Sequence, residues 1–201
     1  MIEERRQLAR RAGATRAALG LSLAVGAALG AYEVAAEFDL DPISYDSPAY
    51  DLVSALDGLA SFVASLFFAF WTVSLVRAAA RAAPGAPLPN AEGAGWVVFF
   101  FPVTLHWPYL AFRQVARAVR VPQAARLALW TYIVWASVVV AAVALYASGG
   151  AYPYVGTSRA HYAVVGAVFW AVAIAPTILQ FMLVGRMSGA VLAEAVEDVF
   201  A

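Results

Sequence analysis

Arginines and long apolar runs alternate along this chain. The arginines crowd residues 1–16, 77–81 and 113–126, and they are nearly absent from the apolar stretches between these clusters. A charged side chain at the centre of a bilayer costs about 2.5–3.5 kcal/mol, so long uncharged runs bracketed by arginine are typical of membrane spans. The pattern predicts an all-α integral membrane protein with four transmembrane helices.

The predicted spans cover residues 17–36, 52–76, 127–147 and 162–184. A helix needs about 20 predominantly apolar residues to cross the hydrocarbon core of a bilayer, and each run meets that length. The first run also imitates a signal peptide, because an arginine-rich leader precedes it. We expect it to remain as an uncleaved first span.

The arginine bias predicts the orientation of the spans. Arginine is favoured in short cytoplasmic segments, so residues 1–16, 77–94 and 185–201 are expected inside. Residues 37–51 carry several carboxylates and no arginine, and are expected outside together with residues 148–161. One membrane domain with both termini in the cytoplasm follows.

Residues 95–121, between the second and third spans, do not fit a fifth crossing. The run from Trp96 to Trp107 is apolar but short, is interrupted by Pro102 and is followed by Pro108. Such a run is typical of a re-entrant or interfacial segment. A crossing would also carry the arginines of residues 113–126 outside, against the arginine bias. We therefore expect a proline-broken segment that dips into the cytoplasmic leaflet and returns.

The second half of that segment is amphipathic. Arg113, Arg117 and Arg120 recur at helical spacing, opposite a face of apolar residues. Anionic lipids attract each basic residue near the cytoplasmic surface by about 1 kcal/mol. These arginines, with Trp107 and Tyr109 at headgroup level, are the candidate lipid-binding residues. The aromatic residues of the segment are expected to pack between spans two and three, either binding a lipid or hydrophobic ligand or only filling space.

The composition agrees with a membrane protein and excludes some classes of chemistry and partner. The chain is 63% hydrophobic and 13% charged, with no net charge, which favours a membrane protein and gives no reason to expect nucleic acid as a partner. It contains no cysteine, so disulfides and thiolate chemistry are excluded. Every basic residue besides histidine is arginine, which indicates a GC-rich bacterial genome and hence a bacterial inner membrane.

Small residues recur at helical spacing in the first two spans. Those expected to pack helices closely are Gly26, Gly30, Ser54, Gly58, Ser61 and Ser65. Packing within the bundle and a docking face for a partner helix or a second copy both fit this pattern.

Two carboxylates lie within or near the spans. Asp57 lies about two turns inside the second span, and Glu33 lies near the outer end of the first. Carboxylates inside a membrane are rare and mark ion or proton pathways, so both are candidates for that role. The alternative for Asp57 is a structural place near the outer interface, with hydrogen bonds to Ser54, Ser61 or the backbone.

The sequence predicts no cofactor, no metal site and no catalytic activity. His106 and His161 are expected at opposite interfaces, too far apart to hold one haem between them. The acidic outer loop lacks the ligand order of a calcium-binding loop. Nucleophile-elbow, phosphate-binding and dinucleotide-binding motifs are absent from the sequence.

One stretch resembles a known family. Gly95 and Trp96 open an aromatic run that ends at Pro102, and Pro108 and Tyr109 then precede a polar helix. This order resembles the bacterial multi-pass membrane family known as domain of unknown function 4328, over about residues 17–186. The family's usual asparagine after the first proline is missing here. The resemblance implies two spans before the segment and two after it. It does not supply an activity.

The favoured hypothesis is a non-enzymatic accessory or scaffold subunit that acts through helix and lipid contacts in a larger membrane assembly. The alternative is a small transporter or channel that uses Asp57 and the re-entrant segment. The two halves of the sequence show no inverted repeat, which counts against the alternative.

Overall fold

The computed structural model describes the backbone of residues 2–37, 48–100, 106–147 and 159–200, and the side chains of most of them. Over these residues the chain is all-helical, as the sequence predicts. The helices are α1 (Ile2–Glu37), α2 (Pro48–Ala82), α3 (Ala91–Phe99), α5 (Trp107–Ala118), α6 (Pro122–Ala147) and α7 (Arg159–Phe200). The tip of the expected acidic loop, most of the second outer loop and Pro102 lie outside the described residues.

Four of these helices are long and apolar enough to cross a membrane. The qualifying stretches are Glu3–Ala35, Pro48–Ala82, Pro122–Val140 and Trp170–Ala193, one for each predicted span. The helices exceed the predicted spans at several ends. α1 has 36 residues and a length of about 54 Å at 1.5 Å per residue, well beyond the roughly 30 Å of a hydrocarbon core. α7 joins the fourth predicted span and most of the predicted cytoplasmic tail, residues 185–201, into one helix.

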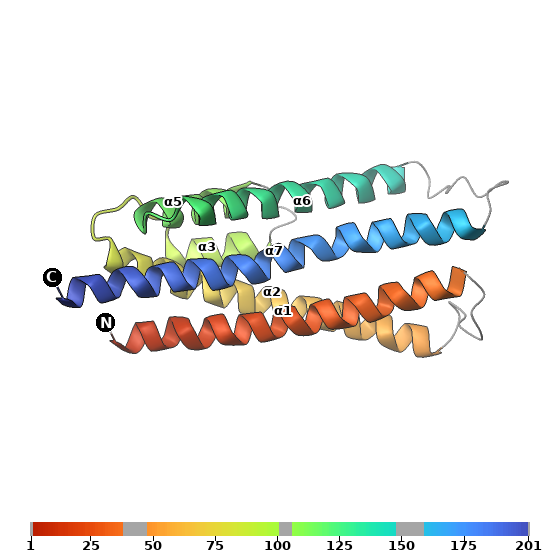
Figure 1. Ribbon diagram of the computed structural model, residues 1–201, viewed down its shortest axis with the longest axis horizontal. Helices are drawn as coiled ribbons and strands as arrows, with labels where there is room; N and C mark the ends of the chain where they lie inside the picture. Colours follow the sequence, from red (N-terminus) through yellow and green to blue (C-terminus); the bar gives the residue numbers. More distant parts are fainter. Residues whose placement is uncertain (1, 38–47, 101–105, 148–158, 201) are drawn as a thin grey trace.

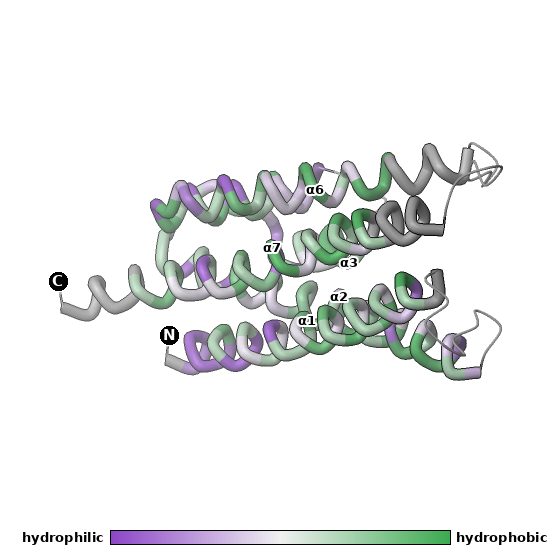
Figure 2. Tube along the Cα trace, turned by 45° about the vertical axis from the view of Figure 1, so that its right-hand side comes forward, coloured by the Kyte–Doolittle hydropathy of each residue, from purple (hydrophilic) through white to green (hydrophobic). Residues whose placement is uncertain are grey.

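The long helices lie side by side and alternate in direction (Figure 1). Both chain termini therefore lie at one end of the bundle, and α3 and α5 lie in the half nearest that end. Hydrophilic residues concentrate along the first turns of α1 and near the start of α6 at the same end (Figure 2). We call this the termini end of the bundle.

The largest fully buried side chains lie toward the termini end. They are Leu8 and Leu19 of α1, Trp71 and Leu75 of α2, Val115 of α5, and Leu183, Val184 and Met187 of α7. Towards the other end, the first half of α2 exposes Leu52, Leu56, Leu59 and Phe62. The chain thus buries its own core at the termini end and leaves apolar side chains uncovered along the rest of its length.

Buried polar groups in this core have partners within the chain. The Trp71 indole Nε1 donates a 2.8 Å hydrogen bond to Ser188 Oγ, joining α2 to α7. Thr15 Oγ1 of α1 donates to the Phe67 carbonyl of α2 at 3.0 Å. Because an unpaired buried polar group costs about 1–3 kcal/mol, such pairs select one arrangement of the helices.

The segment expected to be re-entrant forms two short helices between α2 and α6. α3 begins at an Asn90 cap, whose side chain accepts a 2.8 Å hydrogen bond from the Gly93 amide. α3 then packs along α2, and Gly95 lies so close that an added Cβ would meet Val73 Cγ2 at 2.5 Å. α5 packs against α6.

α5 ends earlier than its arginine spacing suggests. Its last helical residue is Ala118, and Arg120 has a left-handed φ of 53°. The Val121 amide donates to the Ala116 carbonyl at 2.8 Å and the Arg120 amide to the Arg117 carbonyl at 3.2 Å, which is the Schellman pattern of a helix end. Arg120 therefore lies beyond the helix. The expected helical stripe of three arginines is wrong in this respect, because the chain must turn before Pro122 starts α6.

Candidate functional site: two adjoining cavities

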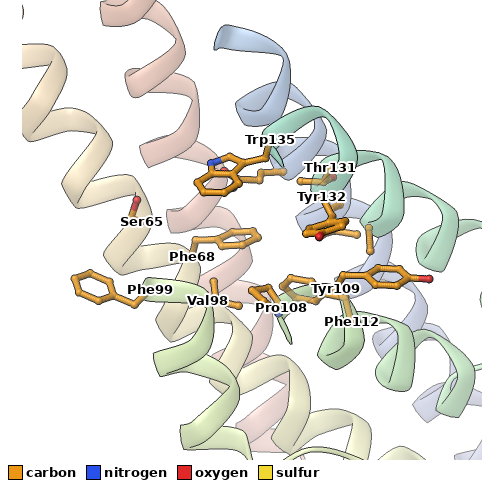
Figure 3. Close-up of a pocket in the computed structure, with 13 residues that line it drawn as sticks. Ser65, Phe68, Val98, Phe99, Pro108, Tyr109, Phe112, Thr131, Tyr132 and Trp135 are labelled. Carbon is orange, nitrogen blue, oxygen red and sulfur yellow. The ribbon is translucent and has the colours of Figure 1, made fainter. Parts of the chain in front are cut away.

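A cavity of about 150 Å³ lies where α2, α3, α5, α6 and α7 meet (Figure 3). Its lining is mainly aromatic and apolar, and consists of Ser65, Phe68, Val98, Phe99, Pro108, Tyr109, Phe112, Ala128, Thr131, Tyr132, Trp135, Gln180 and Leu183. We call it the aromatic cavity. Five of these residues come from the segment between the second and third predicted spans, the region expected from sequence to offer a hydrophobic binding place.

Ring contacts hold the walls of the aromatic cavity. Tyr109 of α5 stacks on Tyr132 of α6 with centroids 6.1 Å apart, and Phe112 packs 5.8 Å from Phe68 of α2. Tyr109, Tyr132 and Trp135 form one side of the cavity, and Val98 and Phe99 lie opposite them (Figure 3). Pockets for drug-sized ligands usually exceed about 300 Å³, so this space suits one ring or part of an acyl chain.

A second cavity of about 180 Å³ adjoins the first and shares Ser65, Trp135 and Gln180 with it. We call it the polar cavity. Ser22 of α1 and Ser61 of α2, which line it, share a 3.1 Å hydrogen bond. Their neighbours in the lining are Leu19, Ala64, Val138, Ala173, Pro176 and Thr177.

Pro176 lies inside α7 and lines the polar cavity. A proline inside a helix cannot donate the hydrogen bond to the carbonyl four residues earlier, here that of Val172. Gln180 and Thr177 follow on the same stretch of α7. The two adjoining cavities are apolar at one end and lined by hydroxyl and amide groups at the other.

The candidate helix-packing residues divide into three groups. An added Cβ at Gly26 would meet Asp57 Oδ1 at 3.1 Å, and one at Gly30 would meet the Trp170 indole at 2.7 Å. Both glycines thus lie at contacts within the chain. Ser54 and Gly58 are exposed, and an added Cβ at Gly58 would meet nothing within 4 Å. Ser61 and Ser65 line the polar cavity.

Glu33 and Asp57 lie on neighbouring helices. Glu33 accepts a 2.9 Å hydrogen bond from the Tyr50 hydroxyl and a 2.6 Å hydrogen bond from Trp170 Nε1. Asp57 is half-buried and faces Gly26. Asp57 makes no hydrogen bond to Ser54 or Ser61 among the described residues, so of the partners expected in the structural alternative the backbone stays a prediction.

The candidate lipid-binding residues do not converge on one site. Tyr109 lines the aromatic cavity, whereas Trp107 is 57% exposed and lies outside both linings. Arg117 and Arg120 are exposed and Arg113 is half-buried, and none of the three lines either cavity.

His106 lines neither cavity. His106 is an exposed residue just before α5, and His161 lies in the first turn of α7, where only the backbone is described. Within the described part of the chain, no three histidine, aspartate or glutamate side chains come together as metal ligands would.

Gln180, Thr131 and Trp135 line the cavities although the sequence pattern did not predict them as site residues. A polar residue well inside an apolar run is a signal that could have drawn attention to Gln180 and Thr131. The position of Trp135 depends on how α6 faces its neighbours, which the pattern of one helix does not reveal.

Comparison with known proteins yields no significant match to a family model, a curated protein or a solved structure. The resemblance to domain of unknown function 4328 stays a prediction.

Proposed function

We propose that this chain is a multi-pass protein of a bacterial inner membrane that works through contacts, as an accessory or scaffold subunit of a larger membrane assembly. The observation that carries the proposal is the exposure of three of its six tryptophans. Trp96, Trp107 and Trp130 are 63%, 57% and 58% exposed, on three neighbouring helices. Tryptophan is enriched both at protein interfaces and at the membrane surface, so we expect these side chains to contact a partner protein or lipid.

In the proposed orientation the termini end faces the cytoplasm. The support is that α1 begins and α2 ends there, together with the arginines at both positions. α3 and α5 then lie in the cytoplasmic leaflet without crossing it. Trp107, Arg113, Arg117 and Arg120 would meet lipid headgroups, and Tyr109 would point inward to the aromatic cavity.

α6 offers the surface for a protein partner. Its main contacts are with α5 and α7, and it exposes Trp130 and Ile133. We expect gentle detergent extraction at native expression to recover the chain in a complex larger than a monomer. Trp130→Ala should release the partner, and Val140→Ala, an equally exposed aliphatic position on the same helix, should retain it. A solitary wild-type chain would contradict the proposal.

A second function, as a small transporter or channel, is favoured by one observation. The polar cavity lies between α1, α2, α6 and α7, and both Glu33 and Asp57 lie on the two helices that supply its serines. Polar groups inside a membrane bundle commonly mark ion or proton pathways.

A proteoliposome flux assay separates the two functions. Transport predicts an ion or proton flux that Asp57→Asn abolishes and that Asp51→Asn, at an exposed carboxylate near the start of the same helix, leaves intact. The scaffold function predicts no flux in any of the three proteins.

A further inference from the structure

A groove of about 450 Å³ runs along the outside of the bundle, between α2 and α3 and beside Arg11 of α1. It shares Phe99 with the aromatic cavity and no lining residue with the polar cavity, and none of the candidate lipid-binding residues lines it. α3 runs antiparallel to α2 along it, since Glu92 meets Arg77 at one end and Phe99 meets Phe62 towards the other. The groove thus has a charged end and an apolar end.

The charged end carries a net positive charge. Arg11 and Arg77 contribute two positive charges and Glu92 one negative charge, and Arg77 is paired with Glu92. Arg11 donates from Nη1 to the Phe70 carbonyl at 3.0 Å and to Ser74 Oγ at 2.7 Å. Its Nε and Nη2 make no hydrogen bond within the described part of the chain. A guanidinium held in this way has donors left for a phosphate oxygen.

The rest of the groove is apolar, with Leu66, Phe70 and Val73 on α2 and Trp96 and Phe99 on α3. Trp96 also packs on Phe100 at 5.8 Å, which extends the aromatic surface beyond the groove. From Ser74, which Arg11 contacts, to Leu66 the helix rises about 12 Å, most of the roughly 15 Å that one leaflet contributes to the hydrocarbon core of a bilayer. The groove therefore matches one leaflet in length and in polarity.

We propose that this groove binds one anionic phospholipid of the cytoplasmic leaflet, with its phosphate on Arg11 and one acyl chain along Leu66, Phe70 and Trp96. The single net positive charge complements the single negative charge of a phosphodiester, and Glu92 limits the attraction by neutralising Arg77. The inference rests on the proposed membrane placement and not on the accessory role.

Native mass spectrometry of the full chain in nonionic detergent tests the site, with dioleoyl phosphatidylglycerol and dioleoyl phosphatidylcholine as probes. The wild type should retain one phosphatidylglycerol in preference to phosphatidylcholine. Arg11→Gln should lower that retention about tenfold, the effect of losing one charge-assisted hydrogen bond. Arg10→Gln removes the same charge one position away, outside the groove, and should change retention less than about twofold by weakening only long-range attraction.

The Glu92→Gln substitution should change phosphatidylglycerol retention in the opposite direction. It frees Arg77 and should raise phosphatidylglycerol retention, an effect that a damaged fold would not produce. Trp96→Ala should lower retention, while Trp130→Ala, equally exposed on α6, should not. Because Trp130→Ala is the variant expected to lose the protein partner, lipid loss and partner loss are separately visible.

Three results would overturn the site. They are equal losses in the Arg11 and Arg10 variants, equal retention of phosphatidylcholine and phosphatidylglycerol by the wild type, and a decrease in the Glu92 variant.

Discussion

Trp170 of α7 packs directly on Gly30 of α1, where an added Cβ would lie 2.7 Å from Cγ and Cδ2 of the indole. The same indole donates its Nε1 hydrogen to Glu33, about one turn further along α1, at 2.6 Å. One side chain thus combines close packing with a hydrogen bond to a carboxylate. It joins α1 and α7 far from the termini end.

Gly30→Ala should destabilise the bundle. Overpacking a filled contact costs about 1–3 kcal/mol, and Trp170 cannot withdraw without losing its hydrogen bond to Glu33. Gly20→Ala is the matched control in the same helix, because its added Cβ meets nothing within 4 Å. It should stabilise by about 0.5–1 kcal/mol through helix propensity. Thermal unfolding in detergent measures both, and shifts of the same sign would contradict the contact.

Ser188→Ala should lower the free energy of unfolding by about 1–3 kcal/mol, since it leaves the buried Trp71 indole N–H without its acceptor. Ser137→Ala provides the comparison. The Ser137 hydroxyl is exposed and donates only to the Ile133 carbonyl of its own helix, so its loss should be nearly neutral. Equal effects in denaturant titrations would show that the α2–α7 hydrogen bond contributes nothing.

Arg120→Gly should stabilise the chain by about 0.5–1 kcal/mol, because glycine adopts the left-handed φ of 53° without the strain a Cβ imposes. Arg117→Gly removes the same charge one residue before Ala118, the last residue of α5, and should cost about 1 kcal/mol in helix propensity. The melting temperatures should therefore move in opposite directions. A loss of stability in both variants would argue against the left-handed helix end.

The ion pair between Arg77 and Glu92 should make stability depend on pH. The hydrogen bond from Arg77 holds the pKa of Glu92 below its ordinary value of 4.5. A lowered folded-state pKa adds stability that is present above the ordinary value and is lost as pH falls through the lowered one. In lipid-free detergent, the small gap in melting temperature between wild type and Glu92→Gln should close below pH 4.5. A gap that is constant with pH would refute this linkage.

Hydropathy predicted the number of long helices but not where they end. Apolar content marks the part of a helix that suits a membrane, whereas the helix continues wherever its residues favour it and one face is covered. In α1, Leu8 and Ala12 precede the predicted span and are buried. The arginines around them are good helix formers, so α1 starts at Ile2 and not near residue 17.

The candidate site was predictable only in outline. The aromatic run and its prolines indicated a packed segment between the second and third spans, and Tyr109 does line a cavity there. The polar cavity was not predicted, because Ser22, Ser61 and Gln180 come from three helices whose mutual rotation depends on tertiary packing. Helical periodicity identifies a face of one helix and not the helix opposite it.

The most direct test of the proposed membrane placement is thiol labelling in this cysteine-free chain. Ala49→Cys, at the start of α2, reports on the side expected to be outside. Ala86→Cys between α2 and α3 and Ala193→Cys late in α7 stand for the cytoplasm. Ala49 and Ala193 are exposed and Ala86 is half-exposed, so a cysteine at each position is accessible to the reagent within the folded chain.

An impermeant thiol reagent is applied to intact cells, with the outer membrane permeabilised where there is one, and again after lysis. Four spans with a cytoplasmic termini end predict that Ala49→Cys is labelled in intact cells, and that Ala86→Cys and Ala193→Cys are labelled only after lysis. Labelling of Ala86→Cys in intact cells would contradict the orientation or the placement of α3 and α5 in the cytoplasmic leaflet.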